Sequence, residues 1–430
     1  MVIRSRNCLL VGLVSVVALS ALCAFTAFGS SDLDSVAIGL ERRLDRELMD
    51  SNGIYGGVKE KSDISKWDAK GFYENSSMVQ GAVLAALCAK YRVLGDPCVL
   101  EKARKLCRGF FRIYELSAPG GKGYYCKPWD WQYQTETSSD QYVYAFLGLD
   151  GYYPFADSCD RKRIRTMIPE MVRFWIDRNY RYQYFGKPLD WQRCRFFAFA
   201  TLGAKYSDDP AFSSEYDRLL SDPAVTNDIP FKASIPLRRG VSKDGDVVYD
   251  GNLEAALSGV LSIHACLAAK KTHPYFDRVM DEIHELVVNM LVPDGTCYHY
   301  AVRNADGSYS ELKRERTCVA PPTPGSEWNA PSFRTFGPFR FGGRHAAAGI
   351  AALALMSPYH KRSNQWLGAH GKGLLARIAA GKLTDYEDPY HILPDDFMKI
   401  IDGRLRGEAI AYWLLAYWTM RESEIETGSF

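Results

Sequence analysis

The sequence lacks the motifs that identify zinc enzymes and nucleic-acid-binding proteins. It contains neither a Cys-x-x-Cys nor a His-Glu-x-x-His motif, so it gives little support to a zinc site. Its 53 Lys and Arg residues nearly balance its 51 Asp and Glu residues, which leaves a net charge of +2 and no basic stripe for a nucleic acid. We therefore predict no metal, no cofactor and no nucleic-acid partner.

The N-terminus has the pattern of a secretory signal peptide. Arg4 and Arg6 precede an apolar stretch from Cys8 to Phe28, and a polar segment follows Gly29. We predict export of the protein, periplasmic or secreted, with cleavage after Gly29. An uncleaved membrane anchor is the alternative, because the apolar stretch is long enough to span a bilayer.

Cysteine gives no regular disulfide framework. Nine cysteines remain after residue 29, an odd number without regular spacing, and most of them fall in predicted helices. Buried free thiols are the usual explanation for such residues. Because export permits disulfides, Cys297 and Cys318, which flank one long loop, are the best candidate pair.

Two kinds of helix are predicted to alternate along residues 30–430. One kind is amphipathic and charged, which indicates a solvent-facing helix: 34–50, 97–116, 160–181, 210–220, 273–291 and 363–380. The other kind opens with a polar cluster and continues in small and apolar residues, which indicates a buried helix. Its polar clusters begin at residues 74, 136, 191, 250, 344 and 408.

Six such helical hairpins form a closed double ring, so the predicted fold is all-α, an (α/α)6 toroid comprising residues 30–430 as one domain. The links from a buried helix to the next charged helix are short, as in Leu94-Gly95-Asp96-Pro97. The links in the other direction are mostly long and rich in Gly and aromatic residues, and loops of that length in a compact domain are usually functional. They should gather at the rim where the buried helices begin.

That rim should attract anions. Six helix N-termini meet there, each with unsatisfied N–H groups and a partial positive charge. The same links carry five arginines: Arg303, Arg334, Arg340, Arg344 and Arg404. These features suggest a substrate with carboxylate or sulfate groups. The alternative is that individual arginines bind loop carbonyls or neighbouring acids.

The polar cluster Glu136-Thr-Ser-Ser-Asp140-Gln141 is the most informative of the six. If the helix begins at or before Glu136, the carboxylates of Glu136 and Asp140 lie on one face of its N-terminal end. A carboxylate pair is what acid/base chemistry on a glycosidic bond uses. Thr137 with Asp140 also resembles a capping box, and the two roles need not exclude each other.

The six polar-headed helices, from Glu74 to Glu408, resemble those of the six-hairpin glycosidase superfamily, which includes the unsaturated glucuronyl hydrolases and related uronic-acid enzymes. The resemblance is architectural and covers nearly all of residues 30–430. It implies catalytic carboxylates at or near the starts of the buried helices, around a pocket lined by aromatic residues. The positions that match are Glu136 and Asp140 on the second buried helix, and Asp250 and Glu254 on the fourth.

We predict Asp140 as the general acid, because burial near Tyr142 and Tyr144 would raise its pKa, and Asp250 as the base. Asp250 also fits a helix N-cap. Further substrate contacts are predicted from polar residues and from aromatic residues, some of which are instead hydrophobic plugs. They are Gln141, Tyr249, Arg334, Arg340, Arg344, His345, Trp129, Trp131, Trp191 and Trp328.

The expected function is a glycoside hydrolase acting on an acidic, uronic-acid-containing oligo- or polysaccharide. A polysaccharide lyase is the first alternative, since Tyr249 or Arg344 with His345 could act in β-elimination. A non-catalytic glycan-binding toroid is the second, because aromatic loops alone serve for binding. The acidic turns at 244–246, 294–295 and 306–307 resemble hairpin tips, and Asp244 and Asp246 do not form a full calcium ligand set.

Overall fold

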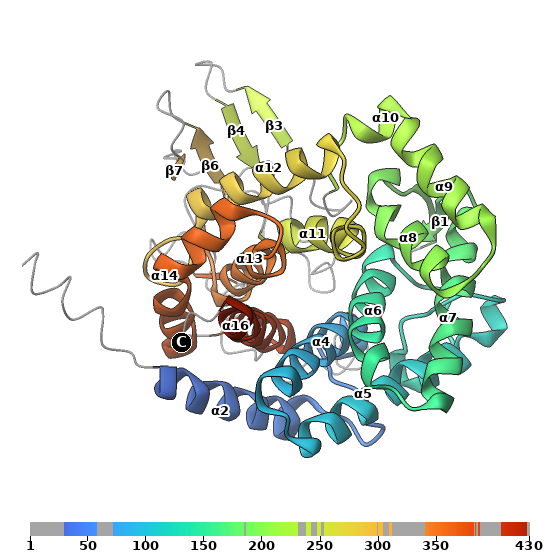
Figure 1. Cartoon of the computed structure of the whole chain (residues 1–430), viewed down its shortest axis with the longest axis horizontal. Helices are drawn as coiled ribbons and strands as arrows, with labels where there is room; N and C mark the ends of the chain where they lie inside the picture. The colour runs from blue at the N-terminus through green and yellow to red at the C-terminus, as the bar shows by residue number, and fades with distance from the viewer. Residues whose placement is uncertain are drawn as a thin grey trace, which may run out of the picture.

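A computed structural model describes residues 30–57, 72–184, 186–230, 238–241, 247–250, 253–298, 300–303, 309–311, 340–381, 383, 386–387 and 406–427. Within them, two concentric rings of helices form the toroid (Figure 1). The inner ring consists of α4 (Ser76–Leu94), α6 (Ser139–Tyr152), α8 (Phe197–Tyr206), α11 (Leu253–Ala268), α13 (Gly343–Met356) and α16 (Gly407–Thr427). The outer ring consists of α2 (Ser30–Leu48), α5 (Pro97–Leu116), α7 (Ser158–Ile176), α9 (Pro210–Ser221), α12 (Pro274–Met290) and α14 (Lys361–Ala380).

The inner helices pack side by side in chain order, and α16 closes the ring against α4. The alternation of buried and charged helices predicted from the sequence is therefore confirmed. Small residues permit the close packing: a Cβ atom on Gly81 of α4 would overlap the carbonyl oxygen of Tyr144 in α6. Nearly all of α13 is buried, from Gly343 to Met356, because it is surrounded by helices on every side.

The links differ in length as the sequence predicts. Between α4 and α5 the chain turns at Gly95, which has a left-handed conformation, and Asp96 caps α5 by accepting a hydrogen bond from the backbone N–H of Cys98 at 2.8 Å. Short elements occupy the other links: α10 (Pro223–Thr226) and the 3₁₀ turns η1 (Ala118–Gly120), η2 (Trp129–Trp131), η3 (Tyr153–Phe155) and η4 (Arg193–Phe196).

Small antiparallel sheets lie on the links that lead to inner helices. The first is a hairpin of β1 (Arg181–Tyr184) and β2 (Lys187–Asp190). Four strands form a second sheet in the order β3 (Arg238–Val241), β4 (Val247–Asp250), β6 (Tyr300–Arg303) and β7 (Tyr309–Glu311), and Figure 1 shows it at the outer edge beside α12. The third contains β5 (Cys297–Tyr298), β8 (Arg340–Phe341) and β9 (Tyr386–Glu387). The expected ribbons around turns 244–246 and 306–307 are thus present.

Cys297 carries a free, buried thiol whose pKa is raised by burial, and its proposed partner Cys318 lies outside the described residues. Among the described residues, no helix is long and apolar enough to cross a membrane. The predicted signal segment, residues 1–29, lies outside the described residues, as do Asp244 and Asp246.

Candidate active site

Four carboxylates are buried where inner helices begin. Glu74 lies just before α4, and Asp140, Glu254 and Glu408 lie in the first turns of α6, α11 and α16. Their exposed fractions are 3%, 4%, 2% and 0%. Buried carboxylates require hydrogen-bond donors or cations, so the partners of these four groups define the site.

Glu254, Arg344 and Glu408 form one network that joins three inner helices. Arg344 Nη2 lies 2.9 Å and 2.7 Å from the two carboxylate oxygens of Glu254, and 3.7 Å from Glu408 Oε1. The hydroxyl of Tyr412 donates to Glu254 Oε1 at 2.9 Å, and Asn75 Nδ2 donates to Glu408 Oε1 at 2.7 Å. This network fixes the starts of α11, α13 and α16 against one another and against α4.

Asp140 has a separate cation. Arg195, which lies in η4 just before α8 and is fully buried, forms an ion pair with Asp140 Oδ1. The neighbouring hydroxyl of Tyr144 lies 3.3 Å from that of Tyr412. Its pKa is raised well above 10, chiefly by burial and then by the charge of Glu254, with a smaller contribution from Asp140. Tyr144 therefore stays protonated between the two carboxylates.

Glu74 forms the third anchor. Its carboxylate forms an ion pair with Lys127 and accepts a hydrogen bond from Trp129 Nε1 at 3.1 Å. Gln141 of α6 donates from Nε2 to the backbone carbonyl of Glu74 at 3.2 Å. Trp129 and Gln141 are therefore held in place by the start of α4, and the side-chain oxygen of Gln141 has no hydrogen-bond partner within the described part of the chain.

The predicted start of α6 needs correction. The helix begins at Ser139, so the half-buried Glu136 precedes it and does not share a helix face with Asp140. The backbone carbonyl of Glu136 instead accepts a hydrogen bond from Lys127 N at 2.9 Å, because residues 132–138 run as an irregular segment beside the chain at Lys127. The predicted capping box is also wrong, since Thr137 donates its hydroxyl proton to the carbonyl of Tyr125.

Asp250 and Tyr249 belong to a strand. Asp250 is the last residue of β4, paired with Arg238 and Tyr300, whereas α11 begins only at Leu253. The N-cap alternative for Asp250 is therefore wrong. Arg340 lies on β8, paired with Tyr298 and Glu387. The structure describes only the backbone of these residues, and Trp328 and Arg334 lie outside the described ranges altogether.

Two of the predicted aromatic contacts already have partners within the protein. Trp191 is 5% exposed, and its ring packs against those of Trp175 and Tyr184, with the guanidinium of Arg195 5.7 Å from its centre. Trp131 is half-buried and donates from Nε1 to Asp50 Oδ2 at 2.7 Å. His345 lies beside Arg344 in the first turn of α13, where it is 3% exposed.

The buried carboxyl groups are of the kind that acid/base catalysis uses, and one carboxyl oxygen among them has no hydrogen-bond partner in the described part of the chain. Glu74, Asp140 and Glu254 each contact a buried cation, whereas Oε2 of Glu408 has no hydrogen-bond partner among the described residues. In the same part of the chain, no group of three or more His, Cys, Asp and Glu side chains could hold a metal ion. One fully buried oxygen, Oε2 of Glu408, is therefore left for a ligand or a water molecule to contact.

Sequence reasoning missed the residues that complete this cluster. Arg195 was overlooked, although an arginine inside the apolar run from Cys194 to Ala200 signals a buried cation that needs an acid partner. Asn75 and Tyr412 carry no comparable signal, because their roles depend on how α4, α11 and α16 meet. Glu408 was named only for its place at the start of a buried helix.

Comparison with family models finds no match, and comparison with curated proteins finds none either. Solved structures do match. An unsaturated glucuronyl hydrolase specific for heparin is 12% identical with a TM-score of 0.50, over 92% of this chain and 96% of the other. A variant of the unsaturated glucuronyl hydrolase of Streptococcus agalactiae, complexed with dGlcA-GalNAc6S, is 11% identical with a TM-score of 0.50, over 91% and 92% of the two chains.

A third similar structure is an α-1,6-mannanase of a Salegentibacter species in complex with α-1,6-mannotetrose. It is 11% identical with a TM-score of 0.44, over 90% of this chain and 98% of the other. At such identities a likeness establishes the fold alone. Together with the two rings of helices, the comparisons show that this chain has the (α/α)6 toroid fold of the unsaturated glucuronyl hydrolases.

Proposed function

We propose that the protein is an exported glycoside hydrolase that cleaves a glycosidic bond in an acidic, uronic-acid-containing oligo- or polysaccharide. The observation that carries the proposal is the group of four buried carboxylates at the starts of inner helices, two of which, Glu254 and Glu408, are joined by Arg344. Hydrolysis of a glycosidic bond needs two carboxyl groups in different states, one donating a proton and one acting as base or nucleophile. The shared fold of the glucuronyl hydrolases supports this reading.

The contacts lead us to assign roles differently from the sequence alone. Asp140, held by its ion pair with Arg195, is our proposed base or nucleophile. Glu408 has one oxygen without a partner and is our proposed proton donor. Glu254 accepts hydrogen bonds from Arg344 and Tyr412 and orients these two side chains, so it is a positioning residue.

The acidic substrate is supported by the cations of the site. Arg195 uses Nη2 for Asp140, while its Nε and Nη1 have no hydrogen-bond partner in the described part of the structure. The first turns of α6, α11, α13 and α16 add their partial positive charge. A uronate carboxylate would satisfy these donors better than a neutral sugar would.

The test is activity of the purified full chain on uronic-acid oligosaccharides, with neutral oligosaccharides alongside and products identified by mass. We expect products heavier in total by one water and no new ultraviolet absorbance. Elimination without water would show a lyase, and binding without turnover would show a glycan-binding protein. Either result would contradict the proposed hydrolysis, and faster turnover of neutral sugars would contradict the acidic substrate.

The role assignment has its own variants. Asp140→Asn and Glu408→Gln should each lower kcat by about 100-fold or more, because general acid/base groups contribute roughly 10²–10⁴-fold. Glu424→Gln, on the same helix as Glu408 but paired with Lys372 at the other end, is the matched control and should keep wild-type turnover. Turnover near the wild-type rate in Glu408→Gln would refute its role as donor.

A further inference from the structure

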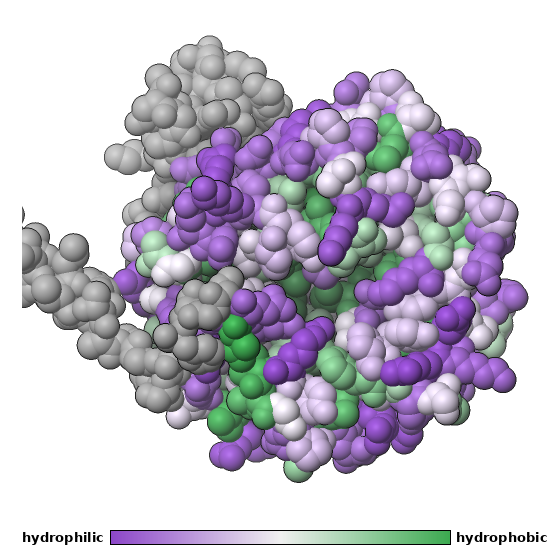
Figure 2. Space-filling view, in the orientation of Figure 1, coloured by the Kyte–Doolittle hydropathy of each residue, from purple (hydrophilic) through white to green (hydrophobic). Residues whose placement is uncertain are grey.

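A cavity of about 370 Å³ opens at the other end of the toroid, away from the carboxylate cluster. Many of its lining residues lie in the later turns of inner helices, including Arg92 of α4, Asp150 of α6 and Lys205 of α8. Asp150 is ten residues beyond Asp140, which places it about 15 Å further along the helix axis. Figure 2 shows a hollow at the centre of this face with hydrophobic residues inside it.

The walls of the cavity are aliphatic. Leucines from five inner helices line it: Leu147, Leu202, Leu261, Leu355 and Leu415. Small residues, among them Ala85, Ala89 and Ala265, leave the space between these helices unfilled. The volume lies in the range of small-molecule sites.

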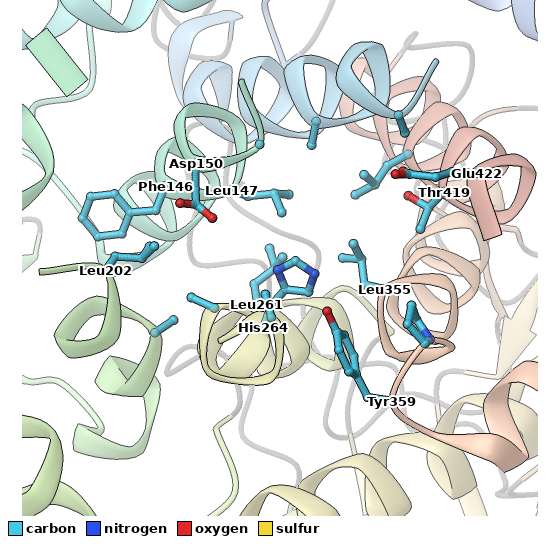
Figure 3. Close-up of a pocket in the computed structure, with 18 of the residues that line it drawn as sticks. Phe146, Leu147, Asp150, Leu202, Leu261, His264, Leu355, Tyr359, Thr419 and Glu422 are labelled. Atoms are coloured by element: carbon cyan, nitrogen blue, oxygen red, sulfur yellow. The ribbon is translucent and has the colours of Figure 1, made fainter. Parts of the chain in front are cut away.

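Polar groups converge at the mouth of this cavity. Figure 3 shows the side chains of Asp150, His264, Tyr359 and Glu422 around one space. Asp150 Oδ1 accepts hydrogen bonds from Lys205 at 2.5 Å and from the Tyr206 hydroxyl at 2.6 Å, whereas Oδ2 has no partner in the described part of the chain. His264 is surrounded by protein, yet part of its ring surface still faces the cavity.

The charges at the mouth favour a cation. Arg92 pairs with Glu422 at 3.2 Å, and Lys205 pairs with Asp150. Glu426 also lines the cavity, so the lining carboxylates outnumber the lining cations by one. Burial lowers the pKa of His264, which keeps its ring neutral near pH 7 and able to accept a hydrogen bond. Burial, together with the charges of Glu426 and Glu422, raises the pKa of Tyr359, whose ring is available to a cation.

We propose that this cavity binds a small amphiphile that consists of an apolar body and one protonated amine. The body lies against Leu147, Leu261 and Leu355, and the ammonium group lies beside Asp150 Oδ2 and the ring of His264. An anionic ligand would meet the excess carboxylate charge, and a neutral one would leave Oδ2 of Asp150 without a donor. The site is separate from the carboxylate cluster and does not depend on the proposed hydrolase activity.

The experiment is calorimetric titration of the full chain at pH 7 with hexylamine, hexanol and hexanoate, which share one chain length. We expect hexylamine to bind at least tenfold more tightly than hexanol, and hexanoate to bind least. Asp150→Asn should reduce the affinity for hexylamine to that for hexanol, because the amide no longer offers an anionic acceptor. Equal binding of all three probes, or no binding, would overturn the proposal.

A second variant locates the binding. Ala265→Leu adds volume inside the cavity and should abolish binding of both hexylamine and hexanol, whereas Ala118→Leu, an exposed position after α5, should leave both unchanged. Thermal unfolding reports whether Ala265→Leu folds; if it does not, the comparison of Asp150→Asn with wild type decides the matter. Retained binding in folded Ala265→Leu would show that the amine binds elsewhere.

Discussion

The same inner helices present opposite chemistry at their two ends. At their starts, Asp140, Glu254 and Glu408 are almost completely buried and contact arginine or amide groups from other helices. At their other ends, Asp150 and Glu422 are about one-fifth exposed, and each contacts a cation that itself reaches solvent. The carboxylates are therefore buried and held by protein groups at one end, and partly exposed to solvent beside a cavity at the other.

Link length explains this difference. The links that lead to inner helices are long, and residues such as Lys127 and Arg195 on them supply cations to the buried acids. The short links at the other end, such as the turn at Gly95, cannot cover the ring, so the space between the last helical turns remains open. Buried charge pairs form where the links cover the ring, and a cavity with exposed charge pairs remains where they do not.

The largest expected effect comes from removing the cation of the buried end. Arg344→Met leaves Glu254 and Glu408 buried without their arginine, and loss of one partner of a buried pair costs roughly 3–5 kcal/mol of the free energy of unfolding. Lys205→Met makes the same change at the exposed end, where Lys205 is half exposed, and should change the stability only slightly. Urea unfolding of both variants and of wild type measures the two changes in the free energy of unfolding.

Equal losses in the two variants would contradict the contrast between the ends. The triple change Glu254→Gln, Arg344→Met, Glu408→Gln provides a further control, since it removes the whole set of charges. It should recover part of the stability lost in Arg344→Met alone, because no uncompensated buried charge remains.

A smaller effect is expected from two glycines of the adjacent helices α4 and α6. Gly81→Ala introduces a Cβ atom that overlaps the carbonyl oxygen of Tyr144 and should lower the free energy of unfolding by about 1–3 kcal/mol. Gly151→Ala, near the end of α6, meets open space and should be neutral or slightly stabilising, since Ala is the better helix former. Thermal unfolding compares the pair, and a destabilised Gly151→Ala would show that this end is closely packed too.

Sequence periodicity was sufficient for the ring but not for the contacts between helices. The outer helix predicted at 97–116 matches α5, because charged and apolar residues alternate with the helical period there. The predicted start of α6 is too early, since the polar run from Glu136 gives no signal that the residues before Ser139 lie outside the helix. The pairing of Asp140 with Arg195 joins residues far apart in sequence, and only the folded ring brings them together.

The cavity could not be predicted from the sequence at all. Ala85, Ala89 and Ala265 are ordinary residues of buried helices, and their small volumes leave a space only where the folded ring brings them around one cavity. His264 and Asp150 were absent from the predicted site for the same reason: each lies within or after an apolar run, without a polar cluster to draw attention to it.

The smallest effect concerns the pH dependence of stability at the cavity. Burial, and then Glu426, raises the pKa of Glu422 above 4.5, although Arg92 acts in the opposite direction. The folded state therefore binds this proton more tightly than the unfolded state does. Ionised Glu422 destabilises the fold, and this cost appears as the pH rises through 4.5 to the raised pKa.

Glu422→Gln should consequently be more stable than wild type at pH 7 and equal to it near pH 3, as measured by unfolding across that range. Glu41 is the control of opposite sign: although burial opposes it, contacts with Lys102 and Lys90 lower its pKa, so Glu41→Gln should lose stability at pH 7 and match wild type near pH 3. A destabilised Glu422→Gln at pH 7 would mean that its pairing with Arg92 outweighs its burial. Pairing with a cation would then stabilise the carboxylates at both ends of the toroid, and the two ends would differ only in how far these groups are exposed.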